Sequence, residues 1–348
     1  MTLEDLGWNA RWAERLAALG DANLCPGRVV WQGSGQYRVA DATGEHAAVL
    51  RGRLRIENAP VPVVGDWVAL EDAGDVWAIA HLLERDSAIV RAAAGTRTEP
   101  QAIAANIATV LLLTDPHDFS PRRLERYSLA IQGADLAVVI NKADLVEDRG
   151  TLWREVERVL PGVPVLFVSA LHGDGVDELT PLLTPGATLA CVGSSGVGKS
   201  TLINRLLGTQ RQETAAVRAH DQRGQHTTTH RELLFLPGGA MVIDTPGLRE
   251  LTPWFADGTV EFADVAALAE HCRFRDCTHG DEPGCAVRAA VADGTMDAGR
   301  VANLAQLQRE AAFQDSRADP LVARARRQRA RSLGKLVRDI EKWHPKRR

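Results

Sequence analysis

The chain has 348 residues, and its hydrophobic content of 45% and charged content of 25% are ordinary for a globular protein. No apolar run approaches the ~20 residues needed to cross a bilayer, and the amino-terminal segment is too charged for a secretory signal, so we expect a cytoplasmic protein with no membrane association. The net charge of −4 conceals a basic tail, because residues 324–348 hold 11 Lys or Arg against 2 Asp or Glu. Five cysteines, an odd number, fit a reducing compartment better than a disulfide framework.

The first part of the chain reads as a β domain. After an amino-terminal extension over residues 1–26, residues 27–98 form short runs typical of β-strands, each closed by Gly, Asp or Asn. Several short strands with turn residues at this spacing predict a small barrel. We favour an OB-type barrel, with an SH3-like barrel as the alternative.

The middle of the chain, residues 99–256, alternates strand and helix patterns. Continuous apolar runs, typical of parallel strands buried on both faces, cover residues 107–115, 136–140, 165–170, 187–193 and 240–245. Helical patterns separate most of these runs, which predicts a doubly wound α/β domain. Residues 257–348 read as a helical domain that contains a Cys/His cluster and ends in the basic tail.

The first chemical motif is GSSGVGKS at residues 193–200, which fits the phosphate-loop pattern between a predicted strand and a predicted helix. Backbone N–H groups at such a helix start bind phosphate, Lys199 reaches the β- and γ-phosphates, and the Ser200 hydroxyl binds Mg²⁺. We also expect Lys199 to act in catalysis. The predicted phosphate-binding residues are Gly193, Ser194, Ser195, Gly196, Val197, Gly198, Lys199, Ser200 and Thr201.

The second motif is NKAD at residues 141–144, which follows a predicted strand at the sheet edge where open α/β domains bind ligands. The Asp144 carboxylate can accept hydrogen bonds from N1–H and the 2-amino group of guanine, a donor pair that adenine lacks. Asn141 can bond the N7 edge of the purine, and the stem of Lys142 can lie along its face. These residues predict selection of guanine nucleotides.

A second base loop, VSA at residues 168–170, ends the next predicted strand. Its Ala170 N–H can donate to the guanine O6, and Ser169 lies beside it in the same loop. Two such loops at successive strand ends are far more specific than either alone.

DTPG at residues 244–247 ends the last predicted strand of this domain, which places Asp244 near the Mg²⁺ ion and the Gly247 N–H near the γ-phosphate. One of three consecutive threonines in a polar segment before it is expected to bind Mg²⁺. The candidates are Thr227, Thr228 and Thr229, of which Thr228 is our choice.

The residue after the DTPG glycine is Leu248, whose side chain cannot orient a water molecule as a glutamine does at this position in many GTPases. His226 precedes the threonines directly, and its imidazole can accept a hydrogen bond from water. We therefore predict that His226 positions the attacking water, with a backbone or RNA group as the alternative.

The Cys/His cluster lies within residues 272–285. Three thiolates and one imidazole form a closed tetrahedral set of the kind that holds structural zinc, with no open position for catalysis. The predicted ligands are Cys272, Cys277, His279 and Cys285. We expect one structural zinc ion.

The guanine loops precede the phosphate loop, the reverse of the usual order, so the chain begins midway through a GTPase fold. Such circular permutation is tolerable because domain termini commonly lie close together. The order resembles that of the circularly permuted GTPases, and the QHTTT and DTPG runs and the Cys/His spacing resemble ribosome small subunit-dependent GTPase A, a bacterial assembly family. The resemblance covers nearly all of residues 27–290.

This resemblance implies a GTP-hydrolysing switch in late maturation of the small (30S) ribosomal subunit, which binds its rRNA and is stimulated by the subunit. GTP with magnesium, GDP and the small subunit would be its partners, and we expect a monomer. The barrel, the zinc cluster and the basic tail also favour RNA binding. The alternatives are an RNA-binding adaptor that holds nucleotide only structurally, and another P-loop NTPase or kinase, which NKAD disfavours.

Overall fold

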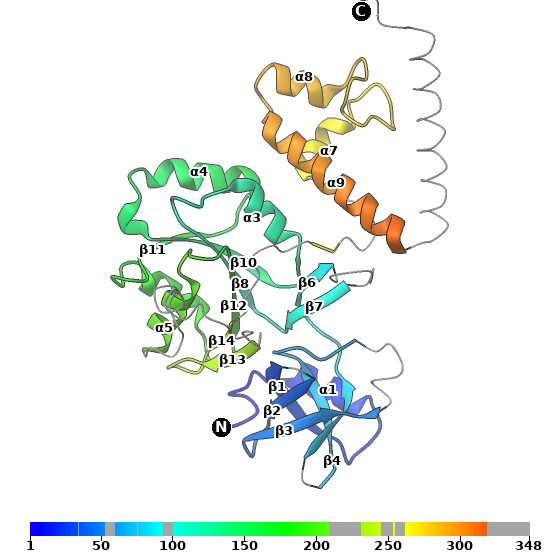
Figure 1. The fold of residues 1–348 in the computed structure, drawn as a ribbon, viewed down its shortest axis with the longest axis vertical. Helices are drawn as coiled ribbons and strands as arrows, with labels where there is room; N and C mark the ends of the chain where they lie inside the picture. Colours follow the sequence, from blue (N-terminus) through cyan, green and yellow to red (C-terminus); the bar gives the residue numbers. More distant parts are fainter. Residues whose placement is uncertain are drawn as a thin grey trace, which may run out of the picture. The chain divides into compact units, whose positions relative to one another are not determined.

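A computed structural model gives the arrangement of most of the chain (Figure 1). The residues that it describes are 1–33, 35–52, 60–74, 76–92, 100–208, 231–244, 253–254 and 262–318. The chain divides into two compact units, one made of residues 1–91 and 101–253 and the other of residues 92–100 and 254–348. None of the helices in the described ranges combines the length and hydropathy that spanning a bilayer requires.

Five strands form the amino-terminal barrel. They are β1 (Cys25–Gly33), β2 (Gln36–Ala40), β3 (Glu45–Leu50), β4 (Trp67–Asp72) and β5 (Trp77–Leu82). Strand β1 pairs with both β2 and β4, and the parallel pairing of β3 with β5 completes the ring. This five-stranded connectivity confirms the OB-type barrel that the sequence favoured.

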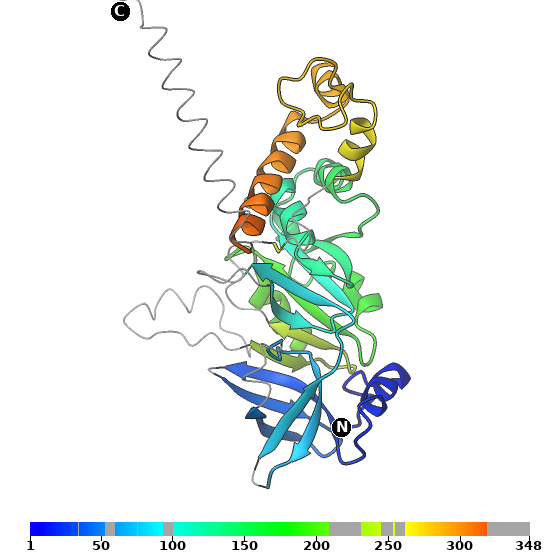
Figure 2. The ribbon, with the colours of Figure 1, turned by 90° about the vertical axis from the view of Figure 1, so that its right-hand side faces the viewer.

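The amino-terminal extension packs on the barrel. Its helix α1 (Ala10–Ala17) begins at Asn9, whose side chain accepts hydrogen bonds from two backbone N–H groups of the first turn. The buried Trp12 of α1 lies 6.2 Å from the buried ring of Trp67 in β4, measured between ring centroids. Figure 2 shows α1, in dark blue, alongside the barrel strands.

The second part of this unit is a mostly parallel sheet with the strand order β11-β10-β8-β12-β14-β13. Only β13 in this set runs antiparallel to its neighbour. The bounds are β8 Thr109–Thr114, β10 Asp135–Asn141, β11 Val165–Val168, β12 Thr188–Gly193, β13 Arg231–Phe235 and β14 Met241–Asp244. The strand order reverses between β8 and β12, the point at which such sheets bind ligands.

Helices cover both faces of this sheet, as a doubly wound domain requires. Val110 and Leu112 of β8 share one core with residues of α3 (Pro121–Ser128) and α4 (Arg149–Val159). Leu111 and Leu113 point into the other core, with residues of α5 and η2. The bounds are α5 Lys199–Leu207 and, for the short 3₁₀ helices, η1 Ala143–Leu145 and η2 Val176–Leu182.

A small second sheet has the strand order β7-β6-β9. Its strands are β6 (Ala88–Ala92), β7 (Pro100–Ala105) and β9 (Ile131–Gln132). Because β6 follows the barrel and β9 follows α3, this sheet links the barrel to the larger sheet along the chain.

The barrel also joins the larger sheet directly, which the sequence did not predict. Strand β1 pairs antiparallel with the edge strand β13, with Trp31 opposite Glu232. Beside this junction, Arg28 of β1 is only 2% exposed. It donates hydrogen bonds to the carbonyl of Leu6, to the carbonyl of Asn106 at 3.1 Å and to Thr188 Oγ1 at 2.7 Å.

These contacts tie the extension, the barrel and β12 together at one side chain. Burial lowers the pKa of Arg28 to about 10, although Asp66 partly offsets this effect. The guanidinium therefore stays charged at neutral pH, and its charge is balanced by carbonyl dipoles and a nearby carboxylate.

The second unit contains three helices among its described residues: α7 (Ala263–Ala269), α8 (Ala286–Ala292) and α9 (Ala298–Ala318). Arg300 of α9 forms a bidentate ion pair with Asp264 of α7, with N–O distances of 2.5 and 2.9 Å. The Arg300 guanidinium also lies 4.5 Å from the ring centroid of Phe262. This pair connects the first and last helices around the Cys/His segment.

Candidate guanine-nucleotide and metal sites

The phosphate-loop motif lies where its chemistry requires it, between the end of β12 and the start of α5. Gly196 and Gly198 have φ values of 88° and 92°, in the left-handed region that side chains disfavour. A Cβ atom on Gly193 would lie 2.3 Å from the carbonyl oxygen of Leu113, so the loop packs tightly on β8. The loop runs directly into the first turn of α5, which contains Ser200 and Thr201.

Lys199 is the first residue of α5, and its side chain turns back over the loop. Its Nζ atom donates to the carbonyl oxygens of Gly193 at 2.7 Å and Ser194 at 2.6 Å. These bonds hold the ammonium group against the backbone of the loop, the part that binds phosphate in proteins with this motif.

Asn141 connects the guanine loops to the phosphate loop. This residue ends β10 and is 2% exposed. Its Oδ1 accepts the N–H of Ala170 at 3.0 Å, and its Nδ2 donates to the carbonyl of Val197 at 2.8 Å. A Cβ atom on Gly198 would come within 2.2 Å of that Nδ2, so only glycine lets the two loops approach this closely. The NKAD, VSA and phosphate loops therefore form one assembly.

The Asp144 carboxylate is oriented by the VSA loop. Ser169 donates its hydroxyl hydrogen to Asp144 Oδ1 at 2.6 Å, and this bond is the main reason that the pKa of Asp144 lies below its ordinary value. His172 Nδ1 lies 3.0 Å from Ser169 Oγ and 3.7 Å from Asp144 Oδ1. The carboxylate is thus ionised at neutral pH, as acceptance of two guanine N–H groups requires.

Lys142 has a left-handed backbone with φ of 56°, and its ammonium pairs with Asp115 Oδ2 at 2.5 Å. Asp115 follows β8 and is 2% exposed. Burial alone would raise the pKa of Asp115, but Lys142 and the N–H of Asp118 hold it below its ordinary value. Asp115 was not among the predicted site residues, although a lone Asp directly after an apolar strand was an available signal.

Two arginines add further contacts that the sequence did not predict. Arg205 of α5 donates to the carbonyl of Ala170 at 3.1 Å and to that of Leu171, which joins the helix after the phosphate loop to the VSA loop. Arg123 of α3 donates to Ser194 Oγ at 2.6 Å. Neither arginine belongs to a spacing pattern that could have marked it.

Asp244 is the last residue of β14, the strand that pairs with β12 in the sheet. Both strands are parallel, so their carboxyl ends meet at the same sheet edge. The other predicted residues of this region fall outside the described residues: His226, Thr227, Thr228, Thr229, Gly247 and Leu248. The basic tail over residues 324–348 also lies outside them.

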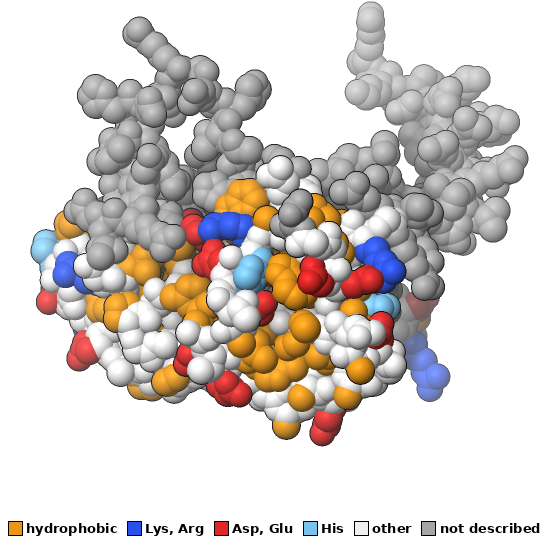
Figure 3. Space-filling model, turned by 90° about the horizontal axis from the view of Figure 1, so that it is seen from below, with side chains coloured by type: hydrophobic (Ala, Val, Ile, Leu, Met, Phe, Trp, Pro, Cys, Tyr) orange, Lys and Arg blue, Asp and Glu red, His pale blue; other side chains and the backbone are white. Residues whose placement is uncertain are grey.

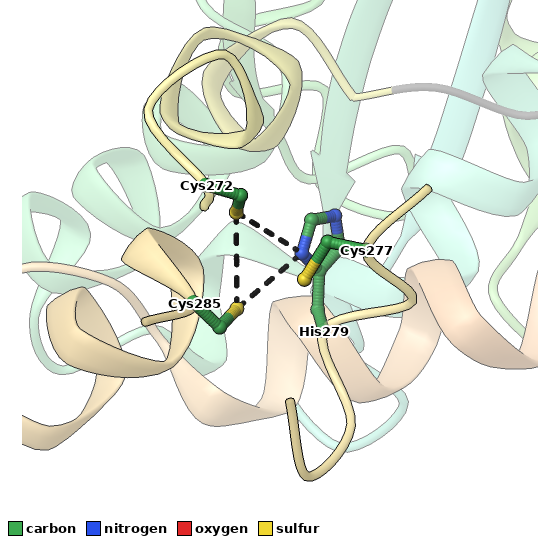
Figure 4. Close-up of side chains that lie close together, drawn as sticks. All are labelled: Cys272, Cys277, His279 and Cys285. Atoms are coloured by element: carbon green, nitrogen blue, oxygen red, sulfur yellow. Dashed lines mark hydrogen bonds between the residues drawn. The ribbon is translucent and has the colours of Figure 1, made fainter. Parts of the chain in front are cut away.

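The four predicted metal ligands converge in the second unit (Figure 4). The ligand atoms of Cys272, Cys277, His279 and Cys285 all lie within 4.8 Å of one another. Cys272 Sγ is 3.9 Å from Cys285 Sγ, and His279 Nδ1 lies 3.8 Å from the first of these sulfurs and 3.5 Å from the second. Bonds of about 2.3 Å to sulfur and 2.0 Å to nitrogen would place tetrahedral zinc ligands about 3.5–3.8 Å apart. The cluster can hold a metal ion.

The start of α8 supports this cluster. Cys285 is the residue before α8, and its Sγ accepts the N–H of Arg288 at 3.4 Å. Burial raises the pKa of the Cys272 thiol, but the backbone N–H groups of Ala286 and Val287 help to outweigh this and leave its pKa below the ordinary value. The helix start therefore favours the thiolate form of Cys272, the form that binds metal.

An OB-type barrel, a permuted sheet with guanine and phosphate loops at one edge, and a helical Cys/His unit together define a circularly permuted P-loop GTPase. The model of the family described as RsgA GTPase matches residues 82–254. The chain belongs to the RsgA GTPase family and is a GTP-hydrolysing enzyme, which confirms the resemblance found in the sequence.

Curated relatives match most of the chain. "Small ribosomal subunit biogenesis GTPase RsgA" of Opitutus terrae is 47% identical over 356 residues, with 96% of each chain covered. The relative of the same description in Xanthomonas axonopodis pv. citri is 43% identical over 362 residues, covering 98% of this chain and 96% of its own.

Solved structures share the fold. The crystal structure of YjeQ from Thermotoga maritima has a TM-score of 0.55 and 28% identity, with 83% of this chain and 98% of that chain covered. YloQ, described as a circularly permuted GTPase, has a TM-score of 0.54 and 24% identity over 83% of this chain and 96% of its own. The second comparison bears on the fold alone, and it agrees with the permuted order of the motifs.

Proposed function

We propose that this GTPase acts as a switch in late maturation of the small ribosomal subunit, binds the rRNA of that subunit and is stimulated by it. The curated relatives carry small ribosomal subunit biogenesis in their descriptions, and they match almost the whole length of this chain. The structural observation that best supports GTP binding is the position of Asn141, whose side chain forms hydrogen bonds with both the VSA loop and the phosphate loop.

In this proposal the guanine base lies against the Asn141 and Asp144 loops, and the phosphates lie on residues 193–201. Asp144 accepts hydrogen bonds from the base. Its carboxylate is suited to this because it is ionised and is oriented by the hydrogen bond from Ser169. Lys199 neutralises charge on the transferring phosphoryl group, because hydrolysis depends mainly on positioning and electrostatic stabilisation.

A magnesium ion would be held by Ser200 in the first turn of α5 and by Asp244 at the end of the adjacent parallel strand. A hydroxyl and a carboxylate are oxygen ligands of the kind that Mg²⁺ prefers, so these residues fit the ion. When bound, the ion neutralises charge on the β- and γ-phosphate oxygens.

We further propose that His226 accepts a hydrogen bond from the attacking water and that Thr228 completes the magnesium site. The water oxygen forms a bond to the γ-phosphorus and gives its proton to His226, which releases it to solvent, while the bond from the γ-phosphorus to the β–γ bridging oxygen breaks, so that GDP and inorganic phosphate leave. His226→Ala should lower the subunit-stimulated rate by about 10²-fold or more while GTP affinity stays unchanged, as general-base positioning requires. Equal stimulated rates for the two proteins would remove His226 from this role.

We assign zinc to the Cys/His cluster. Its four ligand atoms are three sulfurs and one nitrogen, which suit zinc, and the separations among the ligand atoms of Cys272, His279 and Cys285 suit a tetrahedral ion. With every ligand position supplied by protein, the ion would stabilise the unit rather than perform chemistry.

The RNA-binding part depends on charge. Figure 3 looks onto one face of the molecule, where hydrophobic side chains gather near the middle and acidic and basic side chains are scattered around them. No broad basic area stands out on this face among the described residues. We assign the main contact with RNA phosphates to the basic stretch over residues 324–348, because its sequence has 11 Lys or Arg against 2 Asp or Glu.

Sedimentation with purified small subunits tests the proposal. A non-hydrolysable GTP analogue should carry the protein into the subunit fraction, whereas GDP and an ATP analogue should leave most of it behind. Large subunits serve as the control. Equal sedimentation with all three nucleotides would contradict a GTP-dependent switch on this particle.

A further inference from the structure

The segment between β8 and α3 lies at the point where the strand order of the sheet reverses, and it contacts both halves of the candidate nucleotide site. Asp115 Oδ2 pairs with Lys142 of the NKAD loop at 2.5 Å. Asp115 Oδ1 accepts the N–H of Asp118 at 2.9 Å, which fixes the backbone of the segment. Asp118 is therefore held in place by a buried carboxylate that also holds a base-loop lysine.

Arg123 connects this segment to the phosphate loop. Its Nη1 donates to the Asp118 carboxylate and, at 3.3 Å, to the Asp118 carbonyl oxygen. The same Nη1 lies 2.6 Å from Ser194 Oγ. The side chain of Arg123 is 37% exposed, so these contacts rather than tight packing fix its position.

Ser194 therefore accepts hydrogen bonds from two cationic side chains, each at a different oxygen atom. Its hydroxyl oxygen accepts from Arg123, and its carbonyl oxygen accepts from Lys199 at 2.6 Å. The phosphate-loop lysine therefore shares an anchoring residue with an arginine from another helix. A displacement of Ser194 would move one of the two carbonyls that hold the Lys199 ammonium.

We propose that Arg123 is a positioning residue for GTP hydrolysis: it fixes Ser194, and through Ser194 the phosphate loop and Lys199, relative to the β8–α3 segment. This inference rests on the proposed assignment of residues 193–200 to the phosphates. Arg123 acts on the phosphate end of the site, since its contacts do not include Asn141, Asp144 or Ser169. Its loss should therefore lower kcat and leave selection of guanine unchanged.

The test compares Arg123→Ala with Arg122→Ala. Arg122 is the preceding residue in the same helical turn and is exposed, so its variant controls for loss of one positive charge and for helix propensity. Arg123→Ala should lower kcat about tenfold, the loss expected for one hydrogen bond from a charged donor, while KM changes less than kcat. Arg123→Lys, which keeps the charge and one donor, should recover part of the rate.

A double-mutant cycle with Ser194→Ala asks whether Arg123 acts through that hydroxyl. The two single variants and the double variant should have similar kcat values, because each removes the same contact. Independent, additive losses would overturn the proposed route through Ser194. Equal kcat values for Arg123→Ala and Arg122→Ala would overturn the role of Arg123 altogether.

Lys199→Ala separates failure of this inference from failure of the site assignment. If Lys199→Ala abolishes hydrolysis and Arg123→Ala does not lower it, only the inference about Arg123 is wrong. If Lys199→Ala hydrolyses GTP normally, the phosphate site itself is wrongly assigned. Thermal unfolding midpoints of the variants within about 2 °C of wild type would show that a lost rate is not lost folding.

Discussion

Asn141 donates its side-chain amide to the carbonyl oxygen of Val197 at 2.8 Å, across 56 positions of the chain. In a GTPase of the usual order the phosphate loop would precede the guanine loop, and here it follows. The contact forms because β10 and β12 end at the same edge of the sheet, and the order of the two segments in the chain does not affect it. Permutation therefore keeps the contact between the candidate guanine loop and the phosphate loop.

Asp144→Asn should weaken GTP binding by about 10²-fold or more and favour a xanthine nucleotide. The new amide presents a donor toward the guanine 2-amino group, whereas xanthine offers a carbonyl there. Nucleotide affinities measured by fluorescence titration check this expectation. Asp148→Asn is the control, because Asp148 caps α4 just beyond the site, where Asn is an equally good cap. An unchanged preference for GTP would exclude Asp144 from base recognition.

Ser169→Ala should make GTP binding more sensitive to acid. The Ser169 hydroxyl holds the pKa of Asp144 below its ordinary value, so the carboxylate of the wild type stays ionised as pH falls. Without the hydroxyl the pKa of Asp144 should rise toward its ordinary value, and the loss of affinity on acidification should begin at higher pH. Affinity is measured from pH 7 to pH 4 for both proteins. Superimposable pH profiles would show that the hydroxyl does not control this carboxylate.

Freshly purified protein should contain one equivalent of zinc, and Cys277→Ser should lower that content and destabilise the second unit. Removal of one thiolate opens the tetrahedral site, and structural zinc contributes directly to local folding. Metal analysis and circular dichroism measure the two effects. GTP binding should persist in the variant, since the nucleotide residues belong to the other unit. Fresh protein without zinc would contradict the assignment.

Arg28→Met should lower the free energy of unfolding by about 2–4 kcal/mol, because several buried acceptors lose a charged donor at once. Urea unfolding followed by tryptophan fluorescence is a suitable measurement, since the guanidinium lies 5.5 Å from the centroid of the Trp67 ring. Arg38→Met is the control: Arg38 pairs with Glu232 between the barrel and β13 but is 43% exposed, so less than about 1 kcal/mol is expected. Equal losses in both variants would show that burial of Arg28 adds nothing.

Much of the fold could be predicted from local patterns. The strands of the parallel sheet are continuous apolar runs, because both of their faces are buried: in β8, Leu111 and Leu112 point into opposite cores. The guanine loops, the phosphate loop and the Cys/His cluster were predictable because each has residue types at fixed short spacing. The structure brings the predicted Asn141 and Ala170 together, as well as the four metal ligands.

Contacts between distant segments could not be predicted in this way. Arg28 reads as one polar residue in a strand, and its burial depends on Thr188, 160 positions away. Arg123 resembles any charged residue of a helix until α3 is placed beside Ser194. The pairing of β1 with β13 depends on two strand edges meeting, which neither strand's sequence specifies.

The most direct measurement is the rate of GTP hydrolysis by the purified protein, alone and with saturating small ribosomal subunits, beside Lys199→Ala and with ATP as the control nucleotide. We expect slow hydrolysis by the protein alone, clear acceleration by the subunits, little hydrolysis of ATP, and a loss of about 10²-fold or more in kcat for Lys199→Ala. Small subunits that leave the rate unchanged, or a Lys199→Ala variant that keeps the stimulated rate, would contradict the proposal of a subunit-stimulated GTPase acting through this phosphate loop.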